Sequence, residues 1–164
     1  MGGWSTLQTS RNYALAQSAL FCVFAAVFFL DAGPPLFPSG GLPGAIGVVL
    51  CLAGLLLLLS AFASIRGAIQ IAPEPRPGAR LVTRGVYRRL RHPIYTAIVI
   101  LVVGLFLRKP TVLIGIGAAV VIAFLVLKAR FEEKLLLMRY SEYAEYKKRT
   151  WGILLWSHRS RTIR

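Results

Sequence analysis

Two long stretches without a charged residue constrain this chain more than any other feature. Residues 12–30 contain no Asp, Glu, Lys or Arg, and residues 32–65 contain none either. About 20 consecutive apolar residues are enough for a helix to cross the hydrocarbon core of a membrane. We therefore predict membrane spans at residues 12–30 and 43–65, joined by a turn rich in Gly and Pro.

Two shorter apolar stretches, 94–107 and 111–127, lie on either side of a basic RKP sequence and predict a tight helical hairpin. A helix of about 14 residues is about 21 Å long, which is less than the roughly 30 Å of the hydrocarbon core. The third span therefore has to tilt, recruit flanking residues or form a re-entrant hairpin. The predicted fold class is all-α: a polytopic membrane helix bundle with about four transmembrane helices, in a single domain over residues 1–164.

The positions of the charged residues predict the orientation. The chain has 20 Lys and Arg against 6 Asp and Glu, which gives a formal net charge of +14. One basic residue precedes the first span, seven lie in residues 66–91, two follow the third span and ten lie in residues 128–164. Because basic loops stay on the cytoplasmic side, we predict an inner-membrane protein with both termini and the 66–93 loop in the cytoplasm. Topology and contact with anionic lipid then explain the charge, and no nucleic-acid partner is expected.

The loop before the third span ends in the sequence Arg91-His92-Pro93. Proline is favoured at the first position of a helix, which predicts His92 at the cap position and Tyr95 in the first turn. The free N–H groups of a helix N-terminus bind anions, so this end can hold a carboxylate with help from Arg91 and Tyr95. The alternative is that the arginines anchor lipid headgroups and that His92 is only a polar cap.

Two of the six acidic residues, Glu132 and Glu133, are adjacent where the fourth span leaves the membrane. Since the third and fourth spans are antiparallel, both carboxylates are predicted at the same end of the hairpin as His92. Counting about 1.5 Å per residue from the turn places Glu132 roughly 8 Å further into the cytoplasm than His92, within reach of one elongated ligand. The alternative is that the glutamates form ion pairs of low energy with nearby basic residues.

Residues 135–146 continue a helical pattern beyond the fourth span. Tyr140, Tyr143 and Tyr146 recur every three residues. This spacing predicts one amphipathic helix that lies against the membrane or covers the cytoplasmic end of the bundle.

Several motifs in a fixed order resemble the isoprenylcysteine carboxyl methyltransferase family and the related phospholipid N-methyltransferases. They are LVTRGVY at 81–87, RHPIY at 91–95, a membrane hairpin, EExxL at 132–136 and YxxY at 143–146. The resemblance covers residues 72–150. It implies an integral-membrane enzyme that binds S-adenosylmethionine in a cytoplasmic pocket and transfers its methyl group to a lipophilic acceptor from the bilayer.

The resemblance also implies roles for residues. The cofactor pocket would be formed by the 66–93 loop and the C-terminal helix, within catalytic elements 72–95 and 128–150. The implied cofactor-binding residues are Leu81, Val82, Gly85 and Tyr87 for the adenosine, His92 and Tyr95 for the carboxylate end, and Glu132 or Glu133 for the amino group. The implied catalytic residues are Arg91, His92 and Glu133. An arginine of the loop would hold an acidic acceptor or a phosphate, and an amine acceptor would need His92 or a glutamate as a base.

No metal site is predicted, because Cys22 and Cys51 lie apart in the first two spans and form no cluster with His. Two other functions stay open. A membrane reductase of the sterol reductase type would bind the 2′-phosphate of NADPH with the arginines of residues 84–91, although the chain lacks an extended acidic and aromatic catalytic segment. A non-enzymatic membrane scaffold would use the basic loop only for topology and lipid contact. Binding of S-adenosylmethionine, of NADPH or of neither separates the three functions.

Overall fold

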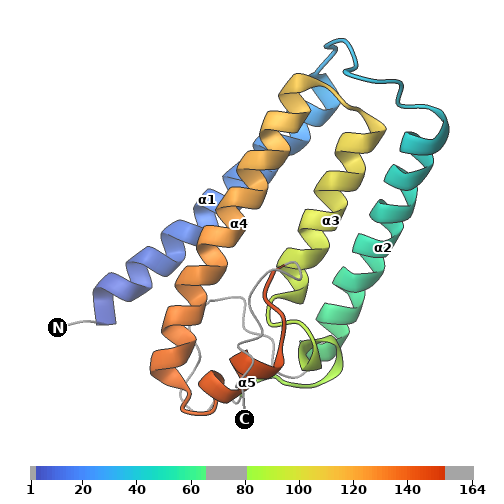
Figure 1. Ribbon diagram of the computed structural model, residues 1–164. Coiled ribbons are helices and arrows are strands. Elements are labelled where there is room, and N and C mark those ends of the chain that lie inside the picture. The colour runs from blue at the N-terminus through green and yellow to red at the C-terminus, as the bar shows by residue number, and fades with distance from the viewer. Residues whose placement is uncertain (1–2, 66–80, 154–164) are drawn as a thin grey trace.

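The computed structural model describes residues 3–65 and 81–153, and these residues form helices (Figure 1). The helices are α1 (Gly3–Leu30), α2 (Gly41–Ile65), α3 (Pro93–Arg108), α4 (Val112–Arg139) and α5 (Tyr143–Arg149), with a short 3-10 helix, η1 (Gly85–Arg88), before α3. An isolated bridge between Leu90 and Trp151 is the only β-type pairing among the described residues. The predicted all-α class is confirmed.

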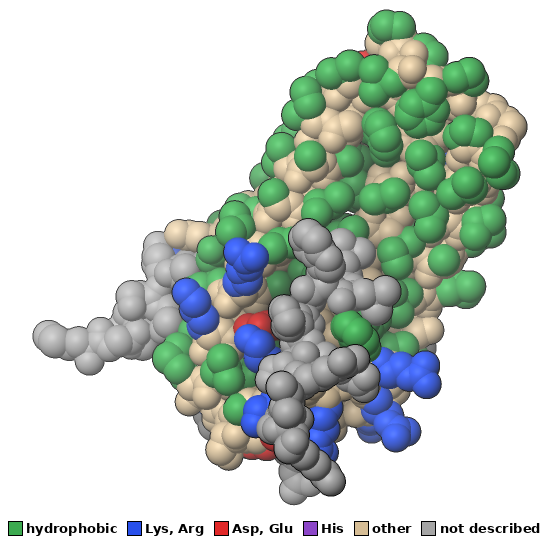
Figure 2. All heavy atoms as spheres, viewed as in Figure 1, with side chains coloured by type: hydrophobic (Ala, Val, Ile, Leu, Met, Phe, Trp, Pro, Cys, Tyr) green, Lys and Arg blue, Asp and Glu red, His purple; other side chains and the backbone are tan. Residues whose placement is uncertain are grey.

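The four long helices alternate in direction and form two antiparallel pairs, α1 with α4 and α2 with α3 (Figure 1). At one end of the bundle α1 and α3 begin and α2 and α4 end. We call this the basic end, because Lys and Arg side chains gather there (Figure 2). The opposite end, the loop end, holds the connection 31–40 and the turn 109–111. The bundle therefore brings the described parts of the two predicted site segments, 81–95 and 128–150, to the same end.

Three helical segments are long and apolar enough to cross a membrane: Arg11–Leu30 within α1, Gly41–Ile65 and Val112–Arg139. Apolar side chains cover the visible surface between the two ends, as expected of an integral membrane protein (Figure 2). The predicted shortness of the third span is confirmed, since α3 has 16 residues and a length of about 24 Å. α4 continues past Leu127 without a break, as the helical count from the turn to Glu132 assumed, so the glutamates lie on the same helix as the fourth span.

A core of apolar side chains joins α1, α3 and α4. Val121 and Leu125 of α4 are fully buried and belong to the same cluster as Val99 of α3. Phe24 of α1 also belongs to it, and a Cβ atom added at Gly117 would lie 3.0 Å from the Phe24 ring. This packing fixes α4 relative to α3, and with it the separation of the side chains at the basic end.

α2 and α3 pack closely because glycines lie where the two helices meet. A Cβ atom added at Gly104 would lie 2.8 Å from both Sγ of Cys51 and the carbonyl oxygen of Gly47. A Cβ atom added at Gly54 would lie 2.7 Å from Cγ of Leu101. Small residues of this kind let the backbones of membrane helices approach each other. The close pair holds α3 against α2.

We expect Gly104→Ala to destabilise the protein, because the added methyl group meets backbone that cannot move without separating α2 from α3. Overpacking of this kind costs about 1–3 kcal/mol, which exceeds the gain of up to about 1 kcal/mol from replacing glycine in a helix. The measurement is the melting temperature in detergent, with an expected fall of about 5 °C. Gly40→Ala is the control, since nothing lies within 4 Å of its added Cβ atom. Equal melting temperatures for the two variants would contradict the close contact.

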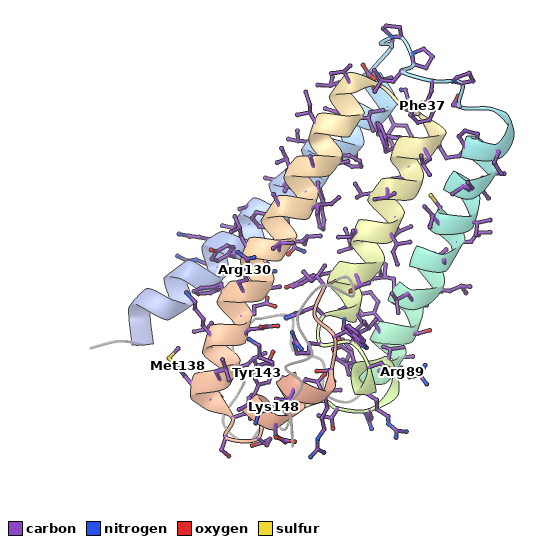
Figure 3. All side chains as sticks on the ribbon, in the orientation of Figure 1. Phe37, Arg89, Arg130, Met138, Tyr143 and Lys148 are labelled. Carbon is purple, nitrogen blue, oxygen red and sulfur yellow. The ribbon has the colours of Figure 1, made fainter. Side chains whose placement is uncertain are left out.

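The helix predicted over residues 135–146 is interrupted. α4 ends before Tyr140, whose backbone is extended with φ −121° and ψ 115°, and α5 begins at Tyr143. The tyrosines do not share one helix, so this prediction is wrong. Tyr143 is 1% exposed and lies on α5 near the end of α4 (Figure 3). The turn folds α5 back toward the start of α3, where the Arg91 guanidinium donates a hydrogen bond to the carbonyl oxygen of Lys147. This contact between distant residues stabilises the interruption.

Candidate functional site

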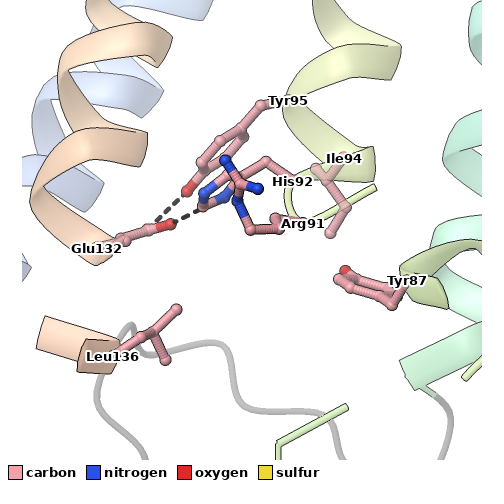
Figure 4. A pocket seen from close by; sticks show the side chains of 7 residues that line it. All are labelled: Tyr87, Arg91, His92, Ile94, Tyr95, Glu132 and Leu136. Carbon is pink, nitrogen blue, oxygen red and sulfur yellow. Dashed lines mark hydrogen bonds and ion pairs between the residues drawn. The ribbon is translucent and has the colours of Figure 1, made fainter. Parts of the chain in front are cut away.

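A pocket of about 190 Å³ lies at the basic end, between the start of α3 and the last turns of α4 (Figure 4). It is lined by Tyr87, Arg91, His92, Ile94, Tyr95, Glu132 and Leu136. Five of these seven residues belong to the predicted site: all except Ile94 and Leu136. The fold therefore brings two segments about 40 residues apart in the sequence into one concave site, as expected of binding sites in general.

His92 caps α3 as predicted, and its ring lies between the two glutamates of α4. Pro93 starts the helix, and the His92 side chain makes no capping hydrogen bond. The side chain is 6% exposed, and its ring stacks on that of Tyr95 with centroids 5.4 Å apart. Nε2 is buried and has no hydrogen-bond partner among the described residues. Its nearest charged neighbour is Oε1 of Glu133 at 3.4 Å, so the ring meets the pocket on the side of Nδ1, which lies toward Glu132.

Glu132 faces His92 in the pocket (Figure 4). Its Oε1 accepts a hydrogen bond of 2.6 Å from the Tyr95 hydroxyl, and its Oε2 lies 3.8 Å from Nδ1 of His92. The predicted offset of roughly 8 Å concerned the positions of the two residues along the helix axis and stays a prediction, whereas the side-chain atoms are within 3.8 Å of each other. His92 precedes the helix with φ −126° and ψ 59°, and both side chains reach across the gap. Side-chain reach therefore brings the two functional groups together.

Glu133 lies near the other ring nitrogen of His92 and belongs to a buried ionic network. Its Oε1 accepts a hydrogen bond of 2.9 Å from Nε of Arg91 and lies 3.4 Å from Nε2 of His92, without the geometry of a hydrogen bond. Its Oε2 lies 2.6 Å from Nζ of Lys147. The Arg91 side chain is 1% exposed and also donates to the carbonyl oxygens of Lys147 and Thr150. The network joins the start of α3 to α4 and α5, and Glu133 does not line the pocket.

Tyr87 of η1 forms another wall of the pocket (Figure 4). Burial, and to a lesser degree the negative charge of Glu132, raises the pKa of the Tyr87 hydroxyl to about 12. The Tyr87 carbonyl oxygen accepts a hydrogen bond of 2.7 Å from the Tyr146 hydroxyl, and burial raises the pKa of Tyr146 to about 12 as well. Both phenols stay protonated at neutral pH. Tyr87 thus offers the pocket a neutral hydroxyl, and Tyr146 attaches η1 to α5.

Leu81, Val82 and Gly85 do not line this pocket. The first two are half-buried before η1. Gly85 has a φ of +59°, and a Cβ atom added there would lie 2.1 Å from Oγ of Ser64 at the end of α2. Glycine is thus required by the backbone conformation and by the contact with α2. A role of these three residues toward adenosine stays a prediction, and residues 66–80 of the predicted loop lie outside the described residues.

Two polar residues that no motif predicts lie beside the pocket. Lys128 of α4 is 8% exposed, and its Nζ donates a hydrogen bond of 2.5 Å to Oε1 of Gln17 on α1. In the sequence, Gln17 lies beside Ser18 in a largely apolar stretch, and Lys128 is one of ten basic residues past the fourth span. For Lys128 the signal is the spacing of four residues to Glu132, which places both on one helix face; the alternative that the glutamates pair with nearby basic residues is confirmed for this pair, at 3.7 Å.

Comparison with known proteins gives the class of this membrane helix bundle. The family model described as phospholipid methyltransferase matches residues 43–143, which is more than half of the chain and includes every residue that lines the pocket. The class is thus that of the membrane methyltransferases. The chain belongs to the phospholipid methyltransferase family, one of the two that its motifs resemble. No curated protein and no solved structure matches the chain.

Proposed function

We propose that this protein is an S-adenosylmethionine-dependent methyltransferase that methylates a lipophilic acceptor at the membrane surface. One arrangement carries the proposal: the imidazole of His92 and the carboxylate of Glu132 line one pocket at the N-terminus of α3, with Nδ1 of His92 3.8 Å from Oε2 of Glu132. The amino-acid end of the cofactor has one carboxylate and one ammonium group, and this pocket offers a partner for each. Family membership supports methyl transfer as the reaction.

The described residues fit the amino-acid end of the cofactor. We assign its carboxylate to His92 and the first turn of α3, and its ammonium to Glu132, which Tyr95 orients through its hydroxyl. The volume of about 190 Å³ is smaller than the roughly 300–1,000 Å³ of complete small-molecule sites, so these residues would hold one end of the ligand. For the adenosine end we propose Tyr87 and the residues of the resembling motif, Leu81, Val82 and Gly85.

When bound, S-adenosylmethionine supplies the methyl group from its sulfonium. A carboxylate acceptor needs no base, whereas an amine acceptor has to lose one proton, and His92 and Glu132 are the groups in the pocket able to accept it. We propose Arg91 and Glu133, which the resemblance implies as catalytic, as positioning residues. They bind each other and α5, and so hold the loop that carries His92.

We propose the amine of a phospholipid headgroup as the acceptor, in preference to the carboxylate of an isoprenylated cysteine. The description of the matching family favours it. Arg88 and Arg89 are exposed on the segment that follows Tyr87, and Arg89 projects away from the bundle (Figure 3). Exposed guanidinium groups one and two residues after Tyr87, which lines the pocket, suit the phosphate of such a headgroup.

The test begins with calorimetric titration of the full-length protein in detergent with S-adenosylmethionine, S-adenosylhomocysteine and NADPH. Saturable binding of the first two ligands, and none of NADPH, is the expected result. Transfer of a labelled methyl group is then measured into vesicles with and without phosphatidylethanolamine, and into an isoprenylcysteine analogue. Binding of NADPH alone would favour the reductase, and a folded sample that binds none of the three would overturn the enzyme.

We further propose that the basic end faces the cytoplasm, on the rule that basic loops stay inside. In a variant with Cys22→Ala and Cys51→Ala, we expect a cysteine at Gly40, on the loop end, to react with a membrane-impermeant maleimide in intact bacterial cells. A cysteine at Arg139, on the basic end, should react only after lysis; both positions are exposed. The reverse pattern of labelling would overturn the orientation and leave the proposed reaction untouched.

A further inference from the structure

Lys128 is a buried cation that the proposed reaction leaves unused. Its Nζ lies 2.5 Å from Oε1 of Gln17, 3.7 Å from Oε1 of Glu132 and 5.3 Å from the centre of the Tyr95 ring. Burying an ammonium group is costly unless its partners compensate for the lost water. Here an amide oxygen, a carboxylate and the face of an aromatic ring provide that compensation. The contacts form a defined polar cluster at the edge of the pocket.

This cluster connects α1 to the pocket through Glu132. Oε1 of Glu132 accepts the hydrogen bond from the Tyr95 hydroxyl and lies 3.7 Å from Nζ of Lys128. The hydroxyl and the ammonium group thus interact with the same oxygen. The other oxygen, Oε2, lies toward His92. A neighbouring stack keeps α1 against α4 at this level, since the rings of Tyr13 and Phe131 lie 4.9 Å apart. Gln17 thus holds the Lys128 ammonium on the side of the helix where it meets Glu132.

We infer that Lys128 and Gln17 are positioning residues, which fix the Glu132 carboxylate for the ammonium group of the ligand. The inference rests on the proposed function, because it assumes that Glu132 binds the amino-acid end of S-adenosylmethionine. It gives α1 a part in the site, although α1 lies outside residues 43–143, which the family model matches. The first helix is then more than a membrane anchor.

Ligands with and without an amino-acid end distinguish this role from a purely structural one. S-Adenosylhomocysteine carries the ammonium group, whereas 5′-methylthioadenosine has the nucleoside and the sulfur but no amino acid. If Lys128 acts through Glu132, its loss weakens only the binding of S-adenosylhomocysteine. If Lys128 merely attaches α1 to α4, its loss disturbs the whole site and weakens the binding of both ligands.

The experiment measures the dissociation constants of both ligands for full-length Lys128→Met and Gln17→Leu. We expect Lys128→Met to raise the dissociation constant of S-adenosylhomocysteine about tenfold, which is within the range of one charge-assisted contact. The dissociation constant of 5′-methylthioadenosine should stay within about twofold of the wild-type value. Gln17→Leu should have a smaller effect of the same kind, and adding it to Lys128→Met should weaken binding no further. Lys128→Arg should restore most of the affinity. Lys134→Met and Ser18→Ala are the matched controls, since both residues are exposed on the same two helices.

Three results would overturn the inference. In the first, Lys128→Met and Gln17→Leu bind S-adenosylhomocysteine as the controls do, while Glu132→Gln weakens it; the proposed function then stands and only the positioning role fails. In the second, both ligands weaken equally and Lys128→Arg does not restore binding, which identifies a structural role. In the third, folded wild-type protein binds neither ligand, and the proposed function fails together with the inference.

Discussion

Glu132→Gln is expected to weaken S-adenosylmethionine binding by about 2 kcal/mol, or roughly 30-fold. The substitution keeps an oxygen that can accept the Tyr95 hydrogen bond, so the local shape changes little. It removes the negative charge that we propose binds the ligand ammonium. The measurement is the dissociation constant from calorimetry at neutral pH.

Glu145→Gln is the control, because Glu145 is an exposed carboxylate on α5 that pairs with Lys148 and Arg149 away from the pocket lining. It should bind the cofactor as the wild type does. Glu133→Gln should reduce stability more than affinity, since Glu133 belongs to the Arg91 network and not to the pocket lining. If Glu132→Gln bound S-adenosylmethionine with wild-type affinity and Glu133→Gln bound it more weakly, Glu133 and not Glu132 would be the residue that binds the ligand ammonium.

Arg91→Met should produce the largest loss of stability. The buried guanidinium is bound to Glu133 and to the carbonyl oxygens of Lys147 and Thr150, and its removal leaves all three acceptors with fewer partners. Removing one partner of a buried ion pair costs about 3–5 kcal/mol. For a chain of this size we expect the melting temperature in detergent to fall by about 10 °C.

Arg89→Met provides the comparison, because Arg89 is exposed two residues away and has the same chemistry. Its melting temperature should stay close to that of the wild type. Arg91→Lys should lie between the two, since a lysine keeps the charge but cannot present the planar fork of donors. Equal melting temperatures for Arg91→Met and Arg89→Met would show that the network contributes nothing to stability.

The parts of the fold that depend on neighbouring residues could be predicted from the sequence. Uncharged stretches of sufficient length identified α1 and α2, and the His92-Pro93 pair located the start of α3, because proline acts on the adjacent backbone. The interruption at Tyr140 could not be predicted. The position of α5 after it is held by contacts such as the hydrogen bond between the Arg91 guanidinium and the Lys147 carbonyl, which joins residues 56 positions apart.

In the candidate site, too, features set by the local sequence could be predicted, whereas features set by contacts between distant residues could not. Antiparallel spans were sufficient to place Glu132 and His92 at one end of the bundle, but the distance between them depends on side-chain reach and helix inclination, which helical rise does not describe. The pairing of Lys128 with Gln17 was not predictable, because it requires the orientation of α1 about its axis against α4. The sequence around Gln17 gives no sign of the partner that its side chain will meet.

The backbone pairing beside the pocket has a consequence for biogenesis. The N–H of Arg91 donates to the carbonyl oxygen of Trp151 at 2.7 Å, and the N–H of Trp151 donates to the carbonyl oxygen of Arg89 at 2.8 Å. During translation, Arg89 and Arg91 leave the ribosome long before Trp151, with the whole α3–α4 hairpin between them. The hairpin therefore enters the bilayer before these two backbone hydrogen bonds exist. They can form only if the segment that carries Arg89 and Arg91 and the segment at Trp151 have stayed on the same side of the membrane. A nascent chain that inserts the hairpin wrongly cannot form these hydrogen bonds, so correct insertion becomes a condition for completing the site.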